Sequence, residues 1–138
     1  MSIKEKGEKS LKTKEKALIS ANAALEKKAF NIVIFEVKRL TSIADYFMIC
    51  SGETERQVRS IVEGIDSILA KRDISPFSIE GMQNSQWVLM DYNDVIIHVF
   101  KEEIREFYDL ERLWQDTPKI LISEGEMNEF YYYNKKNS

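Results

Sequence analysis

The stretch WVLMDYNDVIIHVF, from Trp87 to Phe100, decides the fold because it reads as two apolar strands joined by a tight turn. Asn93 suits that turn, with Tyr92 or Asp94 as its neighbour in a two-residue loop, since Asn and Asp tolerate positive φ. Side chains alternate between the two faces of a strand. One face is therefore purely apolar: Val88, Met90, Ile97 and Val99. The other is mixed: Trp87, Leu89, Asp91, Ile96, His98 and Phe100.

The mixed face of this hairpin allows two interpretations. Large apolar groups beside a carboxylate and an imidazole are typical of a protein-binding patch. Alternatively, helices cover this face as well, and Asp91 and His98 are buried groups with hydrogen-bond partners. Strands buried on both faces are also nearly continuous in apolar residues, so the periodicity alone does not choose between the two.

The chain before the hairpin alternates between helical and extended patterns. Residues 15–28 have apolar side chains at helical spacing, and residues 31–37 and 44–52 have the apolar, β-branched character of buried strands. Thr54 followed by Gln57 predicts a capping box at the start of a second helix. The apolar face of that helix is Val58, Ile61, Val62, Ile65 and Leu69.

The segments that flank the hairpin are less regular. Pro76 excludes a helix and favours an extended segment just before the hairpin. After the hairpin, residues 101–114 predict one helical turn and then, with Asp109 as its cap, a second turn that packs its aromatic side chains on the sheet. Residues 1–14 are rich in Lys and Glu and predict a flexible tail. Residues 15–116 form the predicted domain and residues 117–138 a C-terminal extension, in which residues 122–138 show no clear period.

Composition narrows the function classes. With 138 residues, 43% of them hydrophobic and 31% charged, the chain fits one globular domain. The net charge of −3 argues against general nucleic-acid binding and favours a basic protein partner. Its single cysteine, Cys50, predicts a reducing compartment and the role of a small hydrophobe in a strand. No apolar run is long enough for a membrane span, and the N-terminus does not resemble a signal peptide, so we expect a cytoplasmic protein.

Five motifs in order resemble the Iojap-type ribosomal silencing factor family: DYFMICSG, RQV, EGM, WVLMDYNDVIIHVF and REFYDLERLW. The resemblance covers roughly residues 15–116. It implies an α/β (α+β) fold, nucleotidyltransferase-like, in which helices pack on a single mixed sheet of about five strands. It also implies a non-enzymatic protein, without metal or cofactor, that docks on universal ribosomal protein fourteen of the large subunit. Docking there blocks subunit joining and represses translation when nutrients are scarce.

The resemblance also implies where the partner binds. The corresponding contact positions lie in the hairpin and just before it: Pro76, Glu80, Gly81, Trp87, Leu89, Asp91, Asp94 and His98. A homodimer in the free state is compatible with the family, whereas a membrane or a specific nucleic-acid sequence is not an expected partner. For His98 alone, a structural hydrogen bond is the more common role of a histidine between two apolar residues.

Two rival functions fit the sequence less well. A nucleotidyltransferase-like enzyme needs closely spaced carboxylates for two metal ions, but Asp91 and Asp94 are three positions apart across a turn, a spacing that turn chemistry explains. One His and one Cys make no zinc set. A general RNA-binding module needs a basic stripe with interleaved aromatics, and the acids of REFYDLERLW offset its two arginines.

Overall fold

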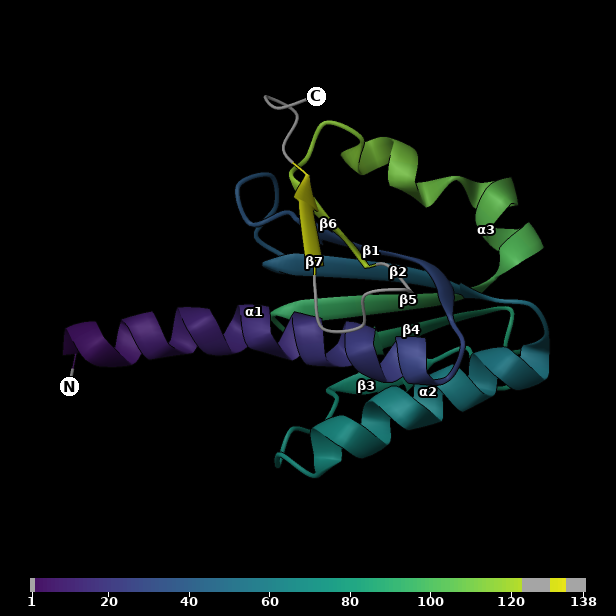
Figure 1. The fold of residues 1–138 in the computed structure, drawn as a ribbon, viewed down its shortest axis with the longest axis horizontal. Coiled ribbons are helices and arrows are strands. Elements are labelled where there is room, and N and C mark those ends of the chain that lie inside the picture. Colours follow the sequence, from purple (N-terminus) through teal and green to yellow (C-terminus); the bar gives the residue numbers. More distant parts are fainter. Residues whose placement is uncertain (1, 123–129, 134–138) are drawn as a thin grey trace.

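One mixed β-sheet forms the body of the protein (Figure 1). The computed structural model describes the backbone of residues 2–122 and 130–133 and the side chains of residues 13–122. The seven strands lie in the order β3-β4-β5-β2-β1-β6-β7, and β2 and β5 are parallel whereas the other neighbours are antiparallel. The strands are β1 (Phe30–Glu36), β2 (Tyr46–Gly52), β3 (Ser78–Glu80), β4 (Trp87–Asp91), β5 (Val95–Lys101), β6 (Lys119–Ile122) and β7 (Phe130–Tyr133).

The hairpin has the predicted turn and the predicted register. Trp87 pairs with Phe100 and Asp91 with Ile96, so β4 and β5 run antiparallel. The backbone N–H of Tyr92 donates to the carbonyl of Val95 at 2.9 Å, which closes a two-residue loop over the intervening pair. The first residue of that loop has a φ of 79°, and its N–H donates to the Asp91 carboxylate at 2.7 Å. An asparagine tolerates this conformation, so the turn fixes which side chains share a face.

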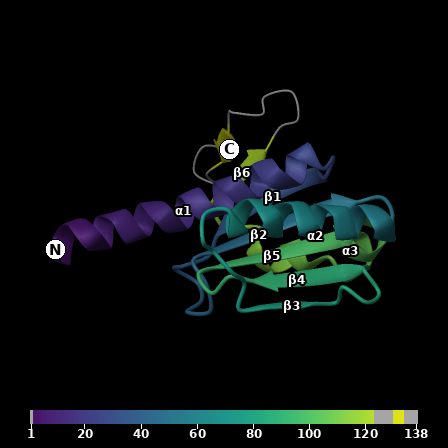
Figure 2. The ribbon, with the colours of Figure 1, turned by 90° about the horizontal axis from the view of Figure 1, so that it is seen from below.

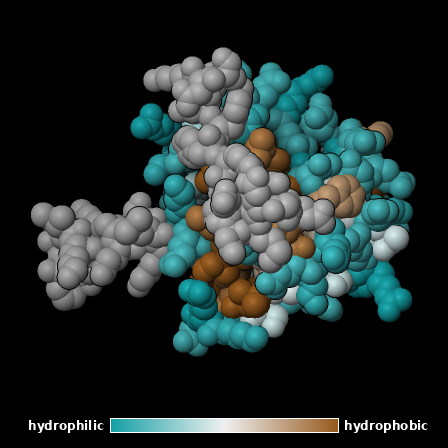
Figure 3. Space-filling model, viewed as in Figure 1, coloured by the Kyte–Doolittle hydropathy of each residue, from teal (hydrophilic) through white to brown (hydrophobic). Residues whose placement is uncertain are grey.

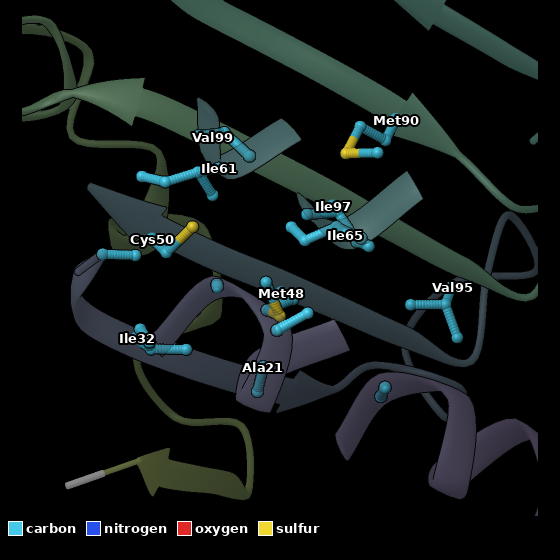
Figure 4. Close-up of a cluster of buried hydrophobic side chains, with 14 of the residues drawn as sticks. Ala21, Ile32, Met48, Cys50, Ile61, Ile65, Met90, Val95, Ile97 and Val99 are labelled. Carbon is cyan, nitrogen blue, oxygen red and sulfur yellow. The ribbon is translucent and has the colours of Figure 1, made fainter. Parts of the chain in front are cut away.

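The apolar face of the hairpin lies against helices α1 (Ser2–Glu26) and α2 (Glu55–Ala70), which both cover the same side of the sheet (Figure 2). Gln57 closes the predicted capping box: its N–H donates to Thr54 Oγ1, and its own Oε1 accepts from the backbone of Glu53 rather than from that of Thr54. Side chains from α1, α2 and the strands β1, β2, β4 and β5 meet in this core (Figure 4), and Ile120 of β6 also belongs to it. All predicted residues of the α2 face and of the apolar hairpin face are at most 1% exposed.

The opposite face of the sheet is covered only in part. Helix α3 (Glu102–Tyr108) and the 3₁₀ helix η1 (Leu110–Trp114) lie over β1, β2 and β5. Trp114 packs edge-on against Phe47, with ring centroids 5.1 Å apart. A second apolar cluster forms beneath them, and its buried members are Phe35, Val37, Ala44, Phe47, Ile49, Ile96 and Phe100. The strands at the β3 edge remain outside this cover, so the buried interpretation of the mixed face is confirmed for β5, whereas the interpretation as a protein-binding patch stays a prediction for the uncovered part.

The predicted α/β class with one mixed sheet is confirmed, but the sheet has seven strands rather than about five. The two additional strands, β6 and β7, come from the predicted C-terminal extension, and β6 pairs with β1 beyond the boundary predicted at residue 116. Four-residue strands are too short for alternation to be recognisable. Helix α1 likewise crosses the boundary predicted at residue 14, because Lys and Glu are good helix formers.

Two predictions for residues 101–114 are confirmed only in part. Asp109 sits at the N-cap position of η1 with a φ of 48°, but its side chain makes no capping hydrogen bond. The aromatic side chains do not all pack on the sheet, since Phe107 and Tyr108 are 77% and 54% exposed. Polar residues occupy most of the periphery in the space-filling view (Figure 3). Among the described residues, no helix combines the length and the apolar character that crossing a bilayer requires.

Candidate protein-binding surface

The uncovered part of the mixed face brings together half of the residues predicted to contact a partner. Glu80 pairs with Leu89, which pairs with His98, so the three side chains form one row across β3, β4 and β5. Leu89 is half-buried and Glu80 is exposed. Tyr108 of α3 borders the row because its ring lies 5.1 Å from that of Trp87. We call this the β3–β4 surface and define it by Glu80, Trp87, Leu89, Asp91 and Tyr108.

Trp87 is held in place by its neighbours and only half-buried. Its indole Nε1–H donates to Nδ1 of His98 at 3.1 Å. The ring stacks on Phe100 with a centroid distance of 4.8 Å. An aromatic side chain that is already fixed loses little entropy on binding, and tryptophan is frequent among the residues that dominate interface energies. Trp87 therefore has the geometry of a preorganised anchor, but its removal also costs the contacts beneath it.

His98 lies under the β3–β4 surface rather than on it. It is 6% exposed, and burial lowers its pKa from 6.5 to about 4. Its ring is neutral at pH 7, and because Nδ1 accepts from Trp87 the ring proton resides on Nε2. His98 thus orients the anchor from below, which matches the structural role that is the more common one for such a histidine.

We expect His98 to make the protein less stable in mild acid. Between pH 6.5 and about 4 the unfolded chain binds a proton at this site that the folded protein does not, so stability falls as the pH falls. The loss is complete below pH 4 at roughly 3 kcal/mol. Chemical denaturation at pH 7 and pH 4 gives the free energy of unfolding of wild type and of His98→Gln. The carboxylates are common to both proteins, so their contribution cancels when the two free energies are subtracted at each pH. A stability difference that is the same at both pH values would contradict the assignment.

Pro76 and Gly81 lie just before and just after β3, at the edge of the β3–β4 surface. Gly81 has a φ of +96°, and a Cβ there would lie 2.3 Å from the carbonyl oxygen of Trp87. Only glycine fits, so Gly81 acts by letting the chain return tightly to the start of β4. Pro76 is half-buried, and the adjacent Phe77 is 84% exposed. Together they leave a large apolar side chain beside the surface at the sheet edge.

Asp94 does not join the β3–β4 surface. Its carboxylate faces α1 on the other side of the sheet, where Oδ1 accepts from Lys16 Nζ at 2.6 Å and Oδ2 accepts from Thr13 Oγ1 at 2.8 Å. Burial raises the pKa of Asp94, but these hydrogen bonds outweigh burial and hold the pKa below its ordinary value. Asp94 therefore fastens the hairpin turn to α1, a role that sequence spacing cannot reveal.

A buried arginine that sequence reasoning missed attaches α3 and η1 to the sheet. Arg105 is 6% exposed and donates to the Asn31 carbonyl at 2.8 Å and to Ser51 Oγ at 2.7 Å. It also makes a two-point ion pair with Glu111, at 3.0 and 2.7 Å. Nothing in REFYDLERLW distinguishes Arg105 from a surface arginine, because the periodicity of a seven-residue helix is too short. Through these bonds Arg105 fixes the position from which Tyr108 borders the surface.

The charges around the β3–β4 surface are mainly acidic. Glu80 is exposed and Asp91 half-buried on the strands. Arg105, the cation of α3, is paired with Glu111 inside the protein. Within the described residues no group of three His, Cys, Asp or Glu side chains is arranged to hold a metal ion. The surface therefore offers a fixed aromatic group, aliphatic area and negative charge, a combination suited to a basic protein.

The pocket beside α3 and the single cysteine lie apart from the β3–β4 surface. A pocket of 660 Å³ lies between α3 and the start of β1, away from the β3–β4 surface. Its buried cation, Arg105, already has a partner in Glu111. Cys50 is fully buried, and burial raises the pKa of its thiol to about 12. It behaves as the predicted small hydrophobe.

A family model and a curated relative both match this chain to ribosomal silencing factors. The model of the family "Ribosomal silencing factor during starvation" matches residues 10–137. The ribosomal silencing factor of Halalkalibacterium halodurans is 36% identical over 104 residues, which are 75% of this chain and 89% of the relative. A crystal structure of a protein from Chromobacterium violaceum superimposes with a TM-score of 0.72 at 27% identity, covering 74% of this chain and 85% of that one.

A more distant relative from mouse is named for assembly of the mitochondrial ribosomal large subunit. It is 30% identical over 92 residues, which are 64% of this chain and 40% of the relative. The matched segment is thus a module within a longer protein there. Its name connects that protein, like the bacterial relative, with the ribosome.

Proposed function

This chain belongs to the ribosomal silencing factor family, and from that premise we propose that it binds the large ribosomal subunit and blocks subunit joining. The partner on the subunit is universal ribosomal protein fourteen, and the outcome is lower translation when nutrients are scarce. The protein acts in the cytoplasm, where the subunits meet.

The observation that carries this proposal is the β3–β4 surface, an acidic and partly apolar area whose Glu80 and Tyr108 are exposed. Ribosomal proteins are basic because they pack on RNA, and opposite charge accelerates association between proteins. Glu80 and Asp91 supply that charge, while Trp87, Leu89 and Tyr108 supply the apolar centre of the interface. In this proposal Pro76 and Gly81 shape the edge, His98 supports the anchor, and Asp94 acts only through the fold.

The same area is a candidate for self-association. Tyr108 is 54% exposed beside the half-buried Trp87. Together they form an exposed apolar area of the kind that marks protein–protein contacts. We propose that a second copy covers it in the free protein, so that dimerisation and ribosome binding compete. Sedimentation equilibrium of the wild type and of Tyr108→Ala tests this, and equal dimer constants for the two proteins would contradict it.

Co-sedimentation with purified ribosomal subunits tests the main proposal. We expect the protein to migrate with the large subunit, not with the small one, and to reduce formation of the joined ribosome as its concentration rises. Binding to the small subunit alone, or binding without any effect on joining, would overturn the proposal. The same preparation is expected to show no transfer from a nucleoside triphosphate, since the paired carboxylates for two metals are lacking among the described residues.

A further inference from the structure

Helix α1 extends well beyond the sheet that its second half covers (Figure 1, Figure 2). It spans 25 residues, and the described side chains that fasten it to the body begin at Thr13, which is 5% exposed. At 1.5 Å per residue, residues 2–12 form an arm of roughly 15 Å. This arm lies on the side of the molecule where α1 meets the hairpin turn, because Thr13 and Lys16 both bond to Asp94.

The charge of the arm is opposite to that of the body. Residues 2–12 contain four lysines and two glutamates, whereas the whole chain has a net charge of −3. The acidic balance is therefore confined to residues 13–138, which include the β3–β4 surface. An arm with an excess of lysine and no aromatic residue suits a partner that is recognised by charge alone.

A further cation, Arg72, lies on the body of the protein beside the root of the arm. Arg72, at the end of α2, lines a hollow of 440 Å³ together with Thr13, Lys16 and Asp94 at the root of the arm. Lys16 compensates the charge of Asp94 at 2.6 Å, and Arg72 is exposed. Arg72 is therefore an exposed cation beside the root of the arm, where the exposed Glu15 lines the same hollow.

We propose that this arm contacts the phosphate backbone of ribosomal RNA beside the docked protein. The inference rests on the proposed function: a ribosomal subunit offers basic protein and anionic RNA next to each other, and this chain carries the complementary acidic surface and basic arm. The contacts are to phosphates and carry no sequence specificity, so they do not make the chain an RNA-binding module in the usual sense. The family match begins at residue 10, so most of the arm precedes it.

The salt dependence of large-subunit binding tests the arm. Each phosphate contact contributes about 0.7 to the slope of log affinity against log salt on single-stranded RNA. Lys6→Gln, Lys9→Gln and Lys12→Gln together are expected to lower the slope by about 2, so that between 50 and 200 mM salt wild type loses roughly fifteenfold more affinity than the variant. Glutamine and lysine have similar helix propensities, so the helix is preserved.

The matched control removes three cations away from the arm, by Lys27→Gln, Lys28→Gln and Arg56→Gln, all exposed in the protein. Its slope is expected to equal that of wild type. An unchanged slope for the arm variant overturns the proposal while leaving the proposed function intact. Wild type that fails to co-sediment at 50 mM salt overturns the proposed function, and the arm proposal with it.

A photoreactive side chain in place of Ser10 identifies the neighbour of the arm directly. Crosslinks to RNA of the large subunit are the expected result. Crosslinks to ribosomal proteins alone, with normal co-sedimentation, would show that the arm contacts protein and would overturn the proposal.

Discussion

Glu80→Arg combined with Tyr108→Ala is expected to lower the affinity for the large subunit by about a hundredfold or more without unfolding the protein. Reversing a charge opposite a basic partner turns attraction into repulsion. Removing a central aromatic side chain costs on the order of 2 kcal/mol, or about thirtyfold in affinity. Both residues are exposed, Tyr108 to 54%, so neither change opens the core. Co-sedimentation at a series of concentrations measures the affinity.

The control for this variant is Glu63→Arg, the same charge reversal at an exposed position of α2 on the other side of the sheet. Its affinity is expected to stay within about twofold of wild type, because only long-range charge changes. Equal losses for the two variants would mean that net charge rather than the β3–β4 surface governs binding. Trp87→Ala is less informative, because it also removes the donor to His98 and the stacking on Phe100.

Ile97→Ala is expected to destabilise the protein by roughly 2–5 kcal/mol. Ile97 is fully buried on β5, the central strand that joins the hairpin to β2, and α2 packs over it (Figure 4). Its removal leaves a cavity that rigid neighbours on both sides cannot fill. The melting temperature should fall by roughly 10 °C in thermal unfolding.

Ile43→Ala is the matched control, since it makes the same chemical change at a side chain that is 68% exposed. Its cost should stay below about 0.5 kcal/mol. If both variants lost similar stability, the face of the hairpin that carries Ile97 would not be the core face. Subunit binding by folded Ile97→Ala is expected to persist, because the β3–β4 surface is on the opposite face.

The hairpin was predictable in detail because two independent signals agree. The alternation from Val88 to Val99 fixes the faces, and Asn93 fixes the turn. Helix α2 was equally accessible, since its cap and its apolar face are local patterns. The location of Trp87 on the mixed face followed from the alternation, and the class of the fold followed from the family resemblance.

The remaining features depend on contacts between distant parts of the chain. Asp94 looks like a turn residue, but its carboxylate bonds to Lys16, 78 positions away. Arg105 looks like a surface arginine, but its partners include Ser51 on strand β2. The exposure of Tyr108 depends on how α3 packs on the sheet, and the hydrogen bonds of Arg105 fix that packing. Local periodicity contains none of these contacts, so the composition of the surface required the structure.

The single parallel pair in the sheet has a consequence for synthesis of the chain. Strand β2 can pair with β1 as soon as it leaves the ribosome, but its other edge waits for β5. At 5–20 residues per second, β5 follows about 50 residues later, so that edge stays open for about 2–10 s. All seven residues of β2 are buried in the finished protein. During those seconds the nascent chain presents an unpaired apolar edge, the period in which it depends most on chaperones and is most prone to pair with another chain.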